Sequence, residues 1–227
     1  MNDKFFEELK EKIQHYFDVS GGHEFDHTQR VYNISLSISK GEDVDMDVVK
    51  AAALIHDIVR AKEDSGEIEC HAKKGAELAK EILSKTDFPK DKIDKVCEAI
   101  RVHRYSKGLK AKTKEAEILQ DADRLDALGA VMIGRVFSRA GKRNRKLYVQ
   151  SDIPEKVYKG KDSTAINHFY EKILKLKTET FKTKKAREIA KERYEFTEKF
   201  VKKFIEEWEG KDLKWKQNFV QNVEVMK

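Results

Sequence analysis

The chain of 227 residues carries 47 lysines and arginines against 41 aspartates and glutamates, a formal net charge of +6. Hydrophobic residues make up 39% and include 12 phenylalanines, which is enough apolar bulk for a core and argues against a disordered chain. Two widely separated cysteines exclude a disulfide framework, and no apolar run approaches the ~20 residues that span a bilayer. We therefore expect a soluble cytoplasmic protein without a membrane partner.

Helices are predicted along most of the chain, because only two prolines and 11 glycines interrupt it. Asn2 or Asp3, an acid within Asp45–Asp47, and Thr113 offer side-chain oxygens that can cap the first turn of a helix. The polar segment 61–67 is predicted to be a loop. Apolar residues recur at helical spacing over roughly residues 3–17, 23–39, 48–59, 68–84, 92–103 and 113–137.

The C-terminal part begins with a long irregular stretch, Gly141 to Lys161, which is rich in lysine and arginine and contains Pro154. A loop of about 20 residues is unusual in a folded protein unless it has a function, so we expect a lid over a site. Two further amphipathic helices are predicted within 163–209, followed by a tail at 211–227. The sequence therefore predicts an all-α fold with one domain at residues 1–210.

The segment AAALIHDIVR, residues 51–60, carries the most informative pattern. An apolar run leads directly into His56 and Asp57, and burying these polar groups is costly unless something satisfies them. A metal ion, a salt-bridge partner or exposure at a helix end would each do so. His27 lies four residues after His23, on the same helical face, and could meet His56 and Asp57 across a helix interface.

A second carboxylate from the acidic run Asp121–Asp126 would complete a set of two imidazoles and two carboxylates. Such mixed ligands suit first-row divalent ions, and an ion held by them could activate water to hydrolyse a phosphate ester or anhydride. Each histidine taken alone is more often a hydrogen-bonded core or surface residue. An acidic run of this kind is often only a helix face paired with lysines.

Three segments in this order, HEFDHTQRV, AALIHDIVR and ILQDADRLDALGAVMIGRVF, resemble the HD superfamily of metal-dependent phosphohydrolases. The chain is most similar to the small bacterial and archaeal predicted HD hydrolases, some of which are nucleotide pyrophosphohydrolases. The resemblance extends over about residues 3–210. It implies an HD-domain helical bundle, with the HD core at about 23–126 and C-terminal helices at 163–209.

The resemblance also implies a site for a divalent ion, which could be Mn, Fe, Co, Ni, Mg or Zn. Helical geometry leaves Asp121 open as the distal ligand in place of Asp123, and Asp121 or Asp126 could instead orient a histidine or a basic group. The implied metal ligands are His27, His56, Asp57 and Asp123.

His71 and His103 occupy positions where two-metal members of the superfamily bind a second ion, and where one-metal members contact substrate or shuttle protons. We expect one firmly bound ion with both histidines catalytic beside the substrate, and a second ion as the alternative. Glu63 follows the metal-binding positions, where a general base would be useful. The residues expected to bind substrate are Arg30, Arg60, Lys62, Arg124 and His23.

Other interpretations of these cations stay open at this point. Arg30, Arg60, Lys62 and Glu63 could be salt-bridged surface residues. Arg135 and the basic stretch 142–146 could close on a polyphosphate, although no motif marks them.

The predicted function is metal-dependent hydrolysis of a small phosphorylated substrate, and a nucleotide is the expected one. One alternative is a di-iron oxygenase of the HD type, which would use His71 and His103 as additional iron ligands. Another is a helical module that binds nucleotide or nucleic acid without turnover, although nucleic acid is not the expected partner. The sequence leaves open the substrate, the metal, the number of ions and the oligomeric state.

Overall fold

The structure, a computed structural model, describes residues 1–17, 25–104, 107–156 and 163–212. Every regular element in these ranges is a helix, which confirms the predicted all-α fold. The α-helices are α1 (Asp3–Gln14), α2 (Phe25–Ile38), α3 (Met46–Ile55), α4 (Arg60–Asp64), α5 (His71–Ser84), α6 (Lys90–Val102), α7 (Lys114–Asp126), α8 (Ala130–Lys142), α9 (Ala165–Glu171) and α10 (Lys184–Trp208), and short 3-10 turns form η2 (Ile173–Lys175) and η3 (Thr178–Thr180).

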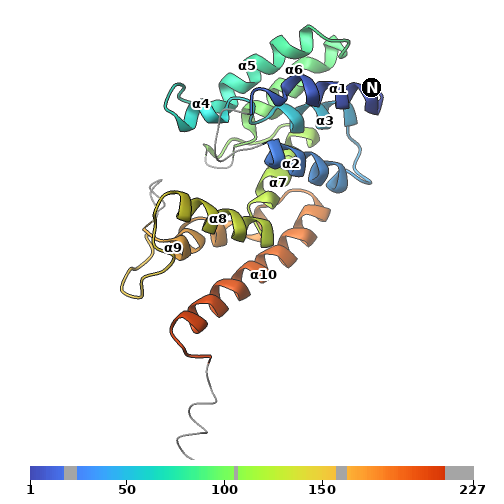
Figure 1. Ribbon diagram of the computed structural model, residues 1–227. Helices are drawn as coiled ribbons and strands as arrows, with labels where there is room; N and C mark the ends of the chain where they lie inside the picture. Colours follow the sequence, from blue (N-terminus) through green and yellow to red (C-terminus); the bar gives the residue numbers. More distant parts are fainter. Residues whose placement is uncertain (18–24, 105–106, 157–162, 213–227) are drawn as a thin grey trace, which may run out of the picture.

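The helices form two groups that meet at α7 (Figure 1). Helices α1 to α6 make up the upper group, in which α3 contacts α2, α6 and α7, and α5 packs along α6. The lower group consists of α8, α9 and the long helix α10, which contacts α7 near its own beginning. Helix α7 therefore belongs to both groups and links them.

Helix α3 is the most deeply buried element. Its residues from Ala51 to Ile55 have no exposed surface, because they are surrounded by α2, α6 and α7. Three successive alanines let these neighbours approach closely, and close approach is what fills a helical core. His56 and Asp57 follow directly, so the apolar run holds the polar pair inside the protein.

The caps predicted from residue type are confirmed at three helices. Asn2 accepts a hydrogen bond from the Phe5 amide at the start of α1. Asp45 and Thr113 cap α3 and α7 in the same way. These side chains satisfy amide groups that the first turn of a helix leaves without a partner.

Two predicted segments differ from the structure. Part of the expected loop at 61–67 is the short helix α4. The helix expected at 113–137 is broken, because Gly129 adopts a φ of 85° between α7 and α8. A side chain at this position would be strained by the backbone and would also meet Arg193, whose Cγ lies 3.2 Å from the site of a Cβ.

The long irregular stretch expected at 141–161 starts later in the structure, and its expected role as a lid stays a prediction. Helix α8 extends to Lys142, and the following loop, described from 143 to 156, packs against α9 and the end of α10. Tyr148, for example, donates a hydrogen bond to Glu209 at 2.8 Å. The described part of the loop is thus attached to the lower group of helices, and residues 157–162 and 213–227 lie outside the described residues.

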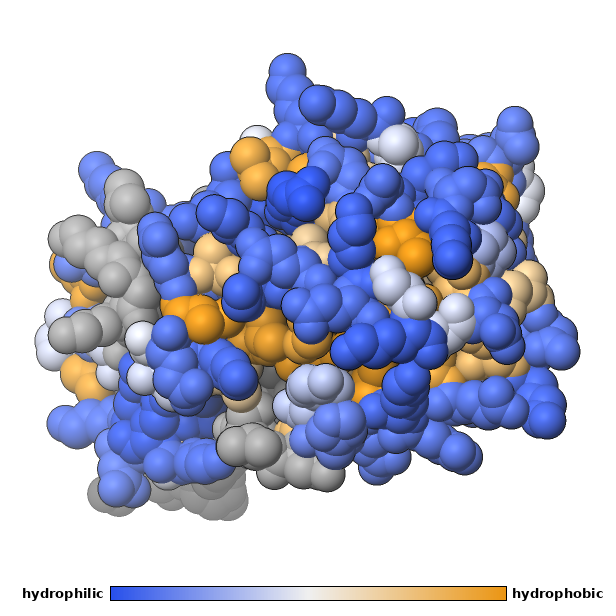
Figure 2. Space-filling view, turned by 90° about the horizontal axis from the view of Figure 1, so that it is seen from above, coloured by the Kyte–Doolittle hydropathy of each residue, from blue (hydrophilic) through white to orange (hydrophobic). Residues whose placement is uncertain are grey.

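The face of the molecule seen from above is largely polar (Figure 2). Hydrophilic residues dominate the face seen in Figure 2, and apolar residues form small patches between them. None of the helices in the described part of the chain has the length and apolar character that crossing a membrane requires.

Candidate metal centre

Four histidine rings converge on the carboxylate of Asp57. One carboxylate oxygen, Oδ2, lies 3.7 Å from Nε2 of His27 and 3.9 Å from Nε2 of His56. The other oxygen, Oδ1, lies 3.2 Å from Nε2 of His71 and 3.4 Å from Nε2 of His103. Each oxygen of Asp57 therefore faces one pair of imidazoles.

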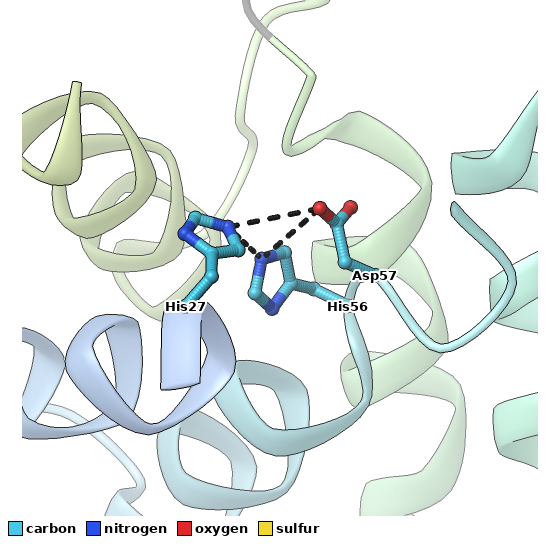
Figure 3. A group of neighbouring side chains, drawn as sticks. All are labelled: His27, His56 and Asp57. Carbon is cyan, nitrogen blue, oxygen red and sulfur yellow. Dashed lines mark hydrogen bonds and ion pairs between the residues drawn. The ribbon is translucent and has the colours of Figure 1, made fainter. Parts of the chain in front are cut away.

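These side chains form two groups that could each hold a cation. His27, His56 and Asp57 make the first group, in which α2 supplies one ring and the end of α3 supplies the other two residues (Figure 3). Asp57, His71 and His103 make the second, and in both groups the donor atoms lie within 4.8 Å of one another. All five residues are buried. Asp57 belongs to both groups, which is the position that a carboxylate between two ions would occupy.

Helix ends orient two of the rings. Nδ1 of His56 lies 2.9 Å from the carbonyl oxygen of Ala53, and Nδ1 of His103 lies 2.6 Å from that of Ile100. Both carbonyls belong to the last turn of a helix, where carbonyl groups lack an intrahelical partner. Because a carbonyl only accepts, each Nδ1 must carry the proton, and each Nε2 is left as a donor atom for a cation.

Carboxylates orient the other two rings. Nδ1 of His27 donates to Oδ2 of Asp126 at 2.8 Å, and Nδ1 of His71 donates to Oε2 of Glu63 at 2.6 Å. A carboxylate in this position fixes the tautomer of a metal-binding histidine and increases its basicity. Each pair of imidazoles thus combines one ring held by a carbonyl with one ring held by an acid.

The arrangement fits a cation on physical grounds. Nε2 of His27 lies 3.4 Å from Nε2 of His56, and the same atoms of His71 and His103 are 3.3 Å apart. When every Nδ1 is protonated and every ring is neutral, lone pairs face one another across these short distances. A divalent ion or a proton between them removes the repulsion. Imidazole with carboxylate is a donor set that first-row divalent ions accept readily.

Burial and neighbouring charges shift the pKa values of this cluster in opposite directions. Burial lowers the pKa of His56 to about 4. Burial also acts to lower the pKa of His27, but the hydrogen bonds to Asp123 and Asp126 and the charge of Asp57 outweigh it and raise the pKa to about 9. His27 is therefore expected to hold a proton at neutral pH, and a metal ion that binds here would have to displace it.

This displacement makes metal affinity depend on pH. The pKa of His27 is raised, so the competing proton is bound below about pH 9 and is lost as the pH rises through that value. We expect the affinity for Mn²⁺ to increase about tenfold per pH unit between about pH 6.5 and 8.5, because binding releases this proton. Calorimetry in buffers of different ionisation enthalpy measures the release. An affinity that stays constant over this range would contradict the expectation.

The two acids that helical geometry left open lie on opposite sides of α7. Oδ1 of Asp123 is 3.5 Å from Nε2 of His27, and its side chain is 27% exposed, so it borders both the cluster and solvent. Asp121 is fully buried and accepts hydrogen bonds from the amides of Lys182 and Thr183. The alternative that Asp121 is the distal ligand is therefore wrong, because this carboxylate anchors the start of α10.

The expected substrate cations lie in different places. Arg60 is partly exposed, with Nη1 3.2 Å from Nδ1 of His71 and Nη2 bonded to Asp64 at 3.1 Å. Lys62 is exposed on α4. Arg30 is partly exposed and binds Asp126, and His23 lies outside the described residues.

Two expected roles are corrected. Arg124 is buried and donates to the carbonyl oxygen of Thr180 at 2.7 Å, so it joins α7 to η3 instead of contacting substrate phosphate. Burial acts to raise the pKa of Glu63, but hydrogen bonds from His71 and the charge of Arg104 lower it to about 2. Such a carboxylate is a poor proton acceptor, so Glu63 orients His71 instead of acting as a general base.

The sequence reasoning missed one arginine and assigned another to a different partner. Nη1 of Arg104 lies 2.7 Å from Oε1 of Glu63, and Nη1 of Arg135 lies 2.7 Å from Oδ2 of Asp126. Arg104 directly follows His103, which was an available signal. No signal in the sequence marks Arg135 as a partner of Asp126, because the break at Gly129 separates the two residues.

The chain is similar to known proteins in sequence and in fold. A model of the HD domain matches residues 25–128. The chain is 33% identical over 203 residues to an uncharacterized protein of Bacillus subtilis (strain 168), YpgQ, covering 86% of this chain and 89% of that protein. The crystal structure of an HD-superfamily hydrolase from Bacillus thuringiensis is similar with a TM-score of 0.70 at 30% identity, covering 91% of this chain and 98% of that one. YpgQ in complex with ADP is similar with a TM-score of 0.69 at 29% identity, covering 90% and 94%.

Proposed function

Because the chain belongs to the HD superfamily of hydrolases, we propose that it is a metal-dependent phosphohydrolase acting on a nucleotide. The observation that carries the proposal is the convergence of four imidazole Nε2 atoms on the buried carboxylate of Asp57. Such an arrangement is costly to bury unless a cation satisfies it.

Two sets of residues would hold the ions. His27, His56 and Asp57, with Asp123 beside them, would bind the first ion, and Asp57, His71 and His103 would bind the second. This favours two ions over the single ion expected from sequence. Such ions would supply an activated water and a Lewis acid for a phosphoryl oxygen.

The protein's own residues would fix this chemistry in place. Asp126 and Glu63 hold His27 and His71 with Nε2 directed at Asp57. Arg60, partly exposed beside His71, is placed to contact a phosphate and offset its charge. Lys62, exposed on α4, could contact a more distant phosphate of a di- or triphosphate.

Two observations support a nucleotide as the substrate. The related protein YpgQ has been crystallised in complex with ADP. The chain carries a net charge of +6, which favours encounter with a polyphosphate.

A panel of nucleoside mono-, di- and triphosphates and cyclic nucleotides tests the proposal, with Mn²⁺, Co²⁺, Ni²⁺ or Mg²⁺ supplied in turn. We expect hydrolysis that requires added metal and stops on chelation, with phosphate and pyrophosphate assayed separately to locate the bond that breaks. Hydrolysis of a non-nucleotide phosphate ester alone would contradict the nucleotide assignment. If neither phosphate nor pyrophosphate is released from any phosphorylated compound, the assignment as a phosphohydrolase is overturned.

The shared carboxylate also suits a di-iron oxygenase, which is the second candidate. Four histidines and a bridging aspartate are sufficient ligands for two irons. Protein purified with two irons per chain, and consuming oxygen with an organic substrate, would favour this candidate over hydrolysis.

A further inference from the structure

Asp126 receives hydrogen bonds from three side chains although it is only 3% exposed. Its Oδ2 accepts from Nδ1 of His27 at 2.8 Å and from Nη1 of Arg135 at 2.7 Å. Nε of Arg30 donates to Oδ1 at 2.6 Å, and Nη2 of Arg30 lies 3.1 Å from Oδ2. The carboxylate that orients His27 is therefore itself held from two further directions.

The two arginines are not equivalent. Arg30 lies on α2, three residues after His27, so it moves together with the ring that Asp126 orients. Arg135 comes from α8, beyond the break at Gly129, and reaches back to Asp126 across the turn. A guanidinium group held in this way restrains the carboxylate independently of α2.

The turn that directs Arg135 toward Asp126 is itself fixed by α10. The amide of Gly129 donates to Oγ1 of Thr197 at 2.9 Å, and Thr197 is fully buried. Arg193 donates to the carbonyl oxygen of Leu125 at 2.7 Å. The start of α8, and with it the position of Arg135, is thus set by contacts outside the metal centre.

We propose that Arg135 is a positioning residue, which holds the Asp126 carboxylate against Nδ1 of His27 and so aims Nε2 of His27 at the metal ion. This inference rests on the proposed function, because it takes His27 as a ligand. It replaces the idea that Arg135 closes on a polyphosphate. Through this contact, α8 influences how tightly the centre binds its ion.

The Arg135→Gln variant tests the inference by calorimetric titration with Mn²⁺ alone. We expect its Kd to rise between about tenfold and 100-fold, the range typical of residues that support a metal ligand. Arg135→Lys, which keeps the charge and one donor, should recover part of the affinity. Arg139→Gln is the matched control, because it removes the same charge from an exposed position one turn further along α8. It should leave the Kd unchanged.

A double-mutant cycle separates positioning from a general structural role. Arg135 acts through Asp126, so Arg135→Gln should have little further effect on the Kd when Asp126 is already asparagine. An equal loss in both backgrounds would overturn the inference. The inference would also be overturned if Arg135→Gln left the Kd for Mn²⁺ unchanged and raised the KM for nucleotide. That result would mean that Arg135 contacts the substrate.

A failure of the proposed function would give a different experimental result. Wild-type protein that binds Mn²⁺ but hydrolyses nothing would remove the phosphohydrolase and leave the test of Arg135 intact. Wild-type protein that binds none of the divalent ions would overturn both.

Discussion

We expect the Asp57→Ala variant to lose metal binding and hydrolysis together while it keeps the wild-type helical fold. Both oxygens of this carboxylate face imidazoles, so one substitution removes a ligand from each of the two groups. Hydrolysis should fall at least about a thousand-fold, because a bound ion contributes several kcal/mol to charge stabilisation and each 1.36 kcal/mol changes the rate about tenfold. Metal content by mass spectrometry, phosphate release and circular dichroism measure the three properties.

Asp94→Ala provides the comparison for Asp57→Ala. Asp94 is an exposed carboxylate on α6 that pairs with Lys80, so its removal should change neither metal content nor rate. Full phosphatase activity in folded, metal-free Asp57→Ala protein would contradict the proposed role of this carboxylate.

The second large effect is expected on stability. Asp121→Ala should lower the free energy of unfolding by about 3 kcal/mol, because it leaves one buried and one partly buried amide at the start of α10 without an acceptor. Those amides belong to Lys182 and Thr183, and the hydroxyl of Thr183 also donates to this carboxylate. Urea denaturation of the metal-free variant measures the loss. The Mn²⁺ affinity of the folded variant should match the wild type.

Asp123→Ala should show the reverse pattern. Its side chain is partly exposed and contacts His27, so the substitution should weaken Mn²⁺ binding and change stability little. Loss of metal affinity in Asp121→Ala, together with normal affinity in Asp123→Ala, would reverse the assignment of the distal ligand.

Local patterns made most of the fold predictable. Apolar spacing located most of the helices, and short polar side chains near Asn2, Asp45 and Thr113 indicated where three of them begin. The break at Gly129 was missed because apolar residues continue at helical spacing on both sides of it. Glycine is required there by the φ of 85° and also by the close approach of Arg193, which follows 64 residues later and has no local signal.

The metal centre was also predictable in part. The resemblance to the HD superfamily implied that His27, His56 and Asp57 act together, and the structure places them in one group. Helical geometry alone could not distinguish Asp121 from Asp123, although the resemblance implied Asp123, because the choice depends on segment 182–183, which docks against one side of α7. Arg124 was misassigned for a related reason, since a positive charge in a sequence does not reveal its partner.

The rings around Asp57 are oriented by the folded chain itself, because each Nδ1 is bonded to a backbone or side-chain oxygen. Under the proposed function, the ion binds this prearranged set and has no comparable site in the unfolded chain. A free ion concentration about 100 times its Kd would then add about 2.7 kcal/mol to the stability of the folded state. The amount of folded protein in a cell would therefore follow the supply of divalent ions, so metal scarcity would reduce the abundance of the protein as well as its activity.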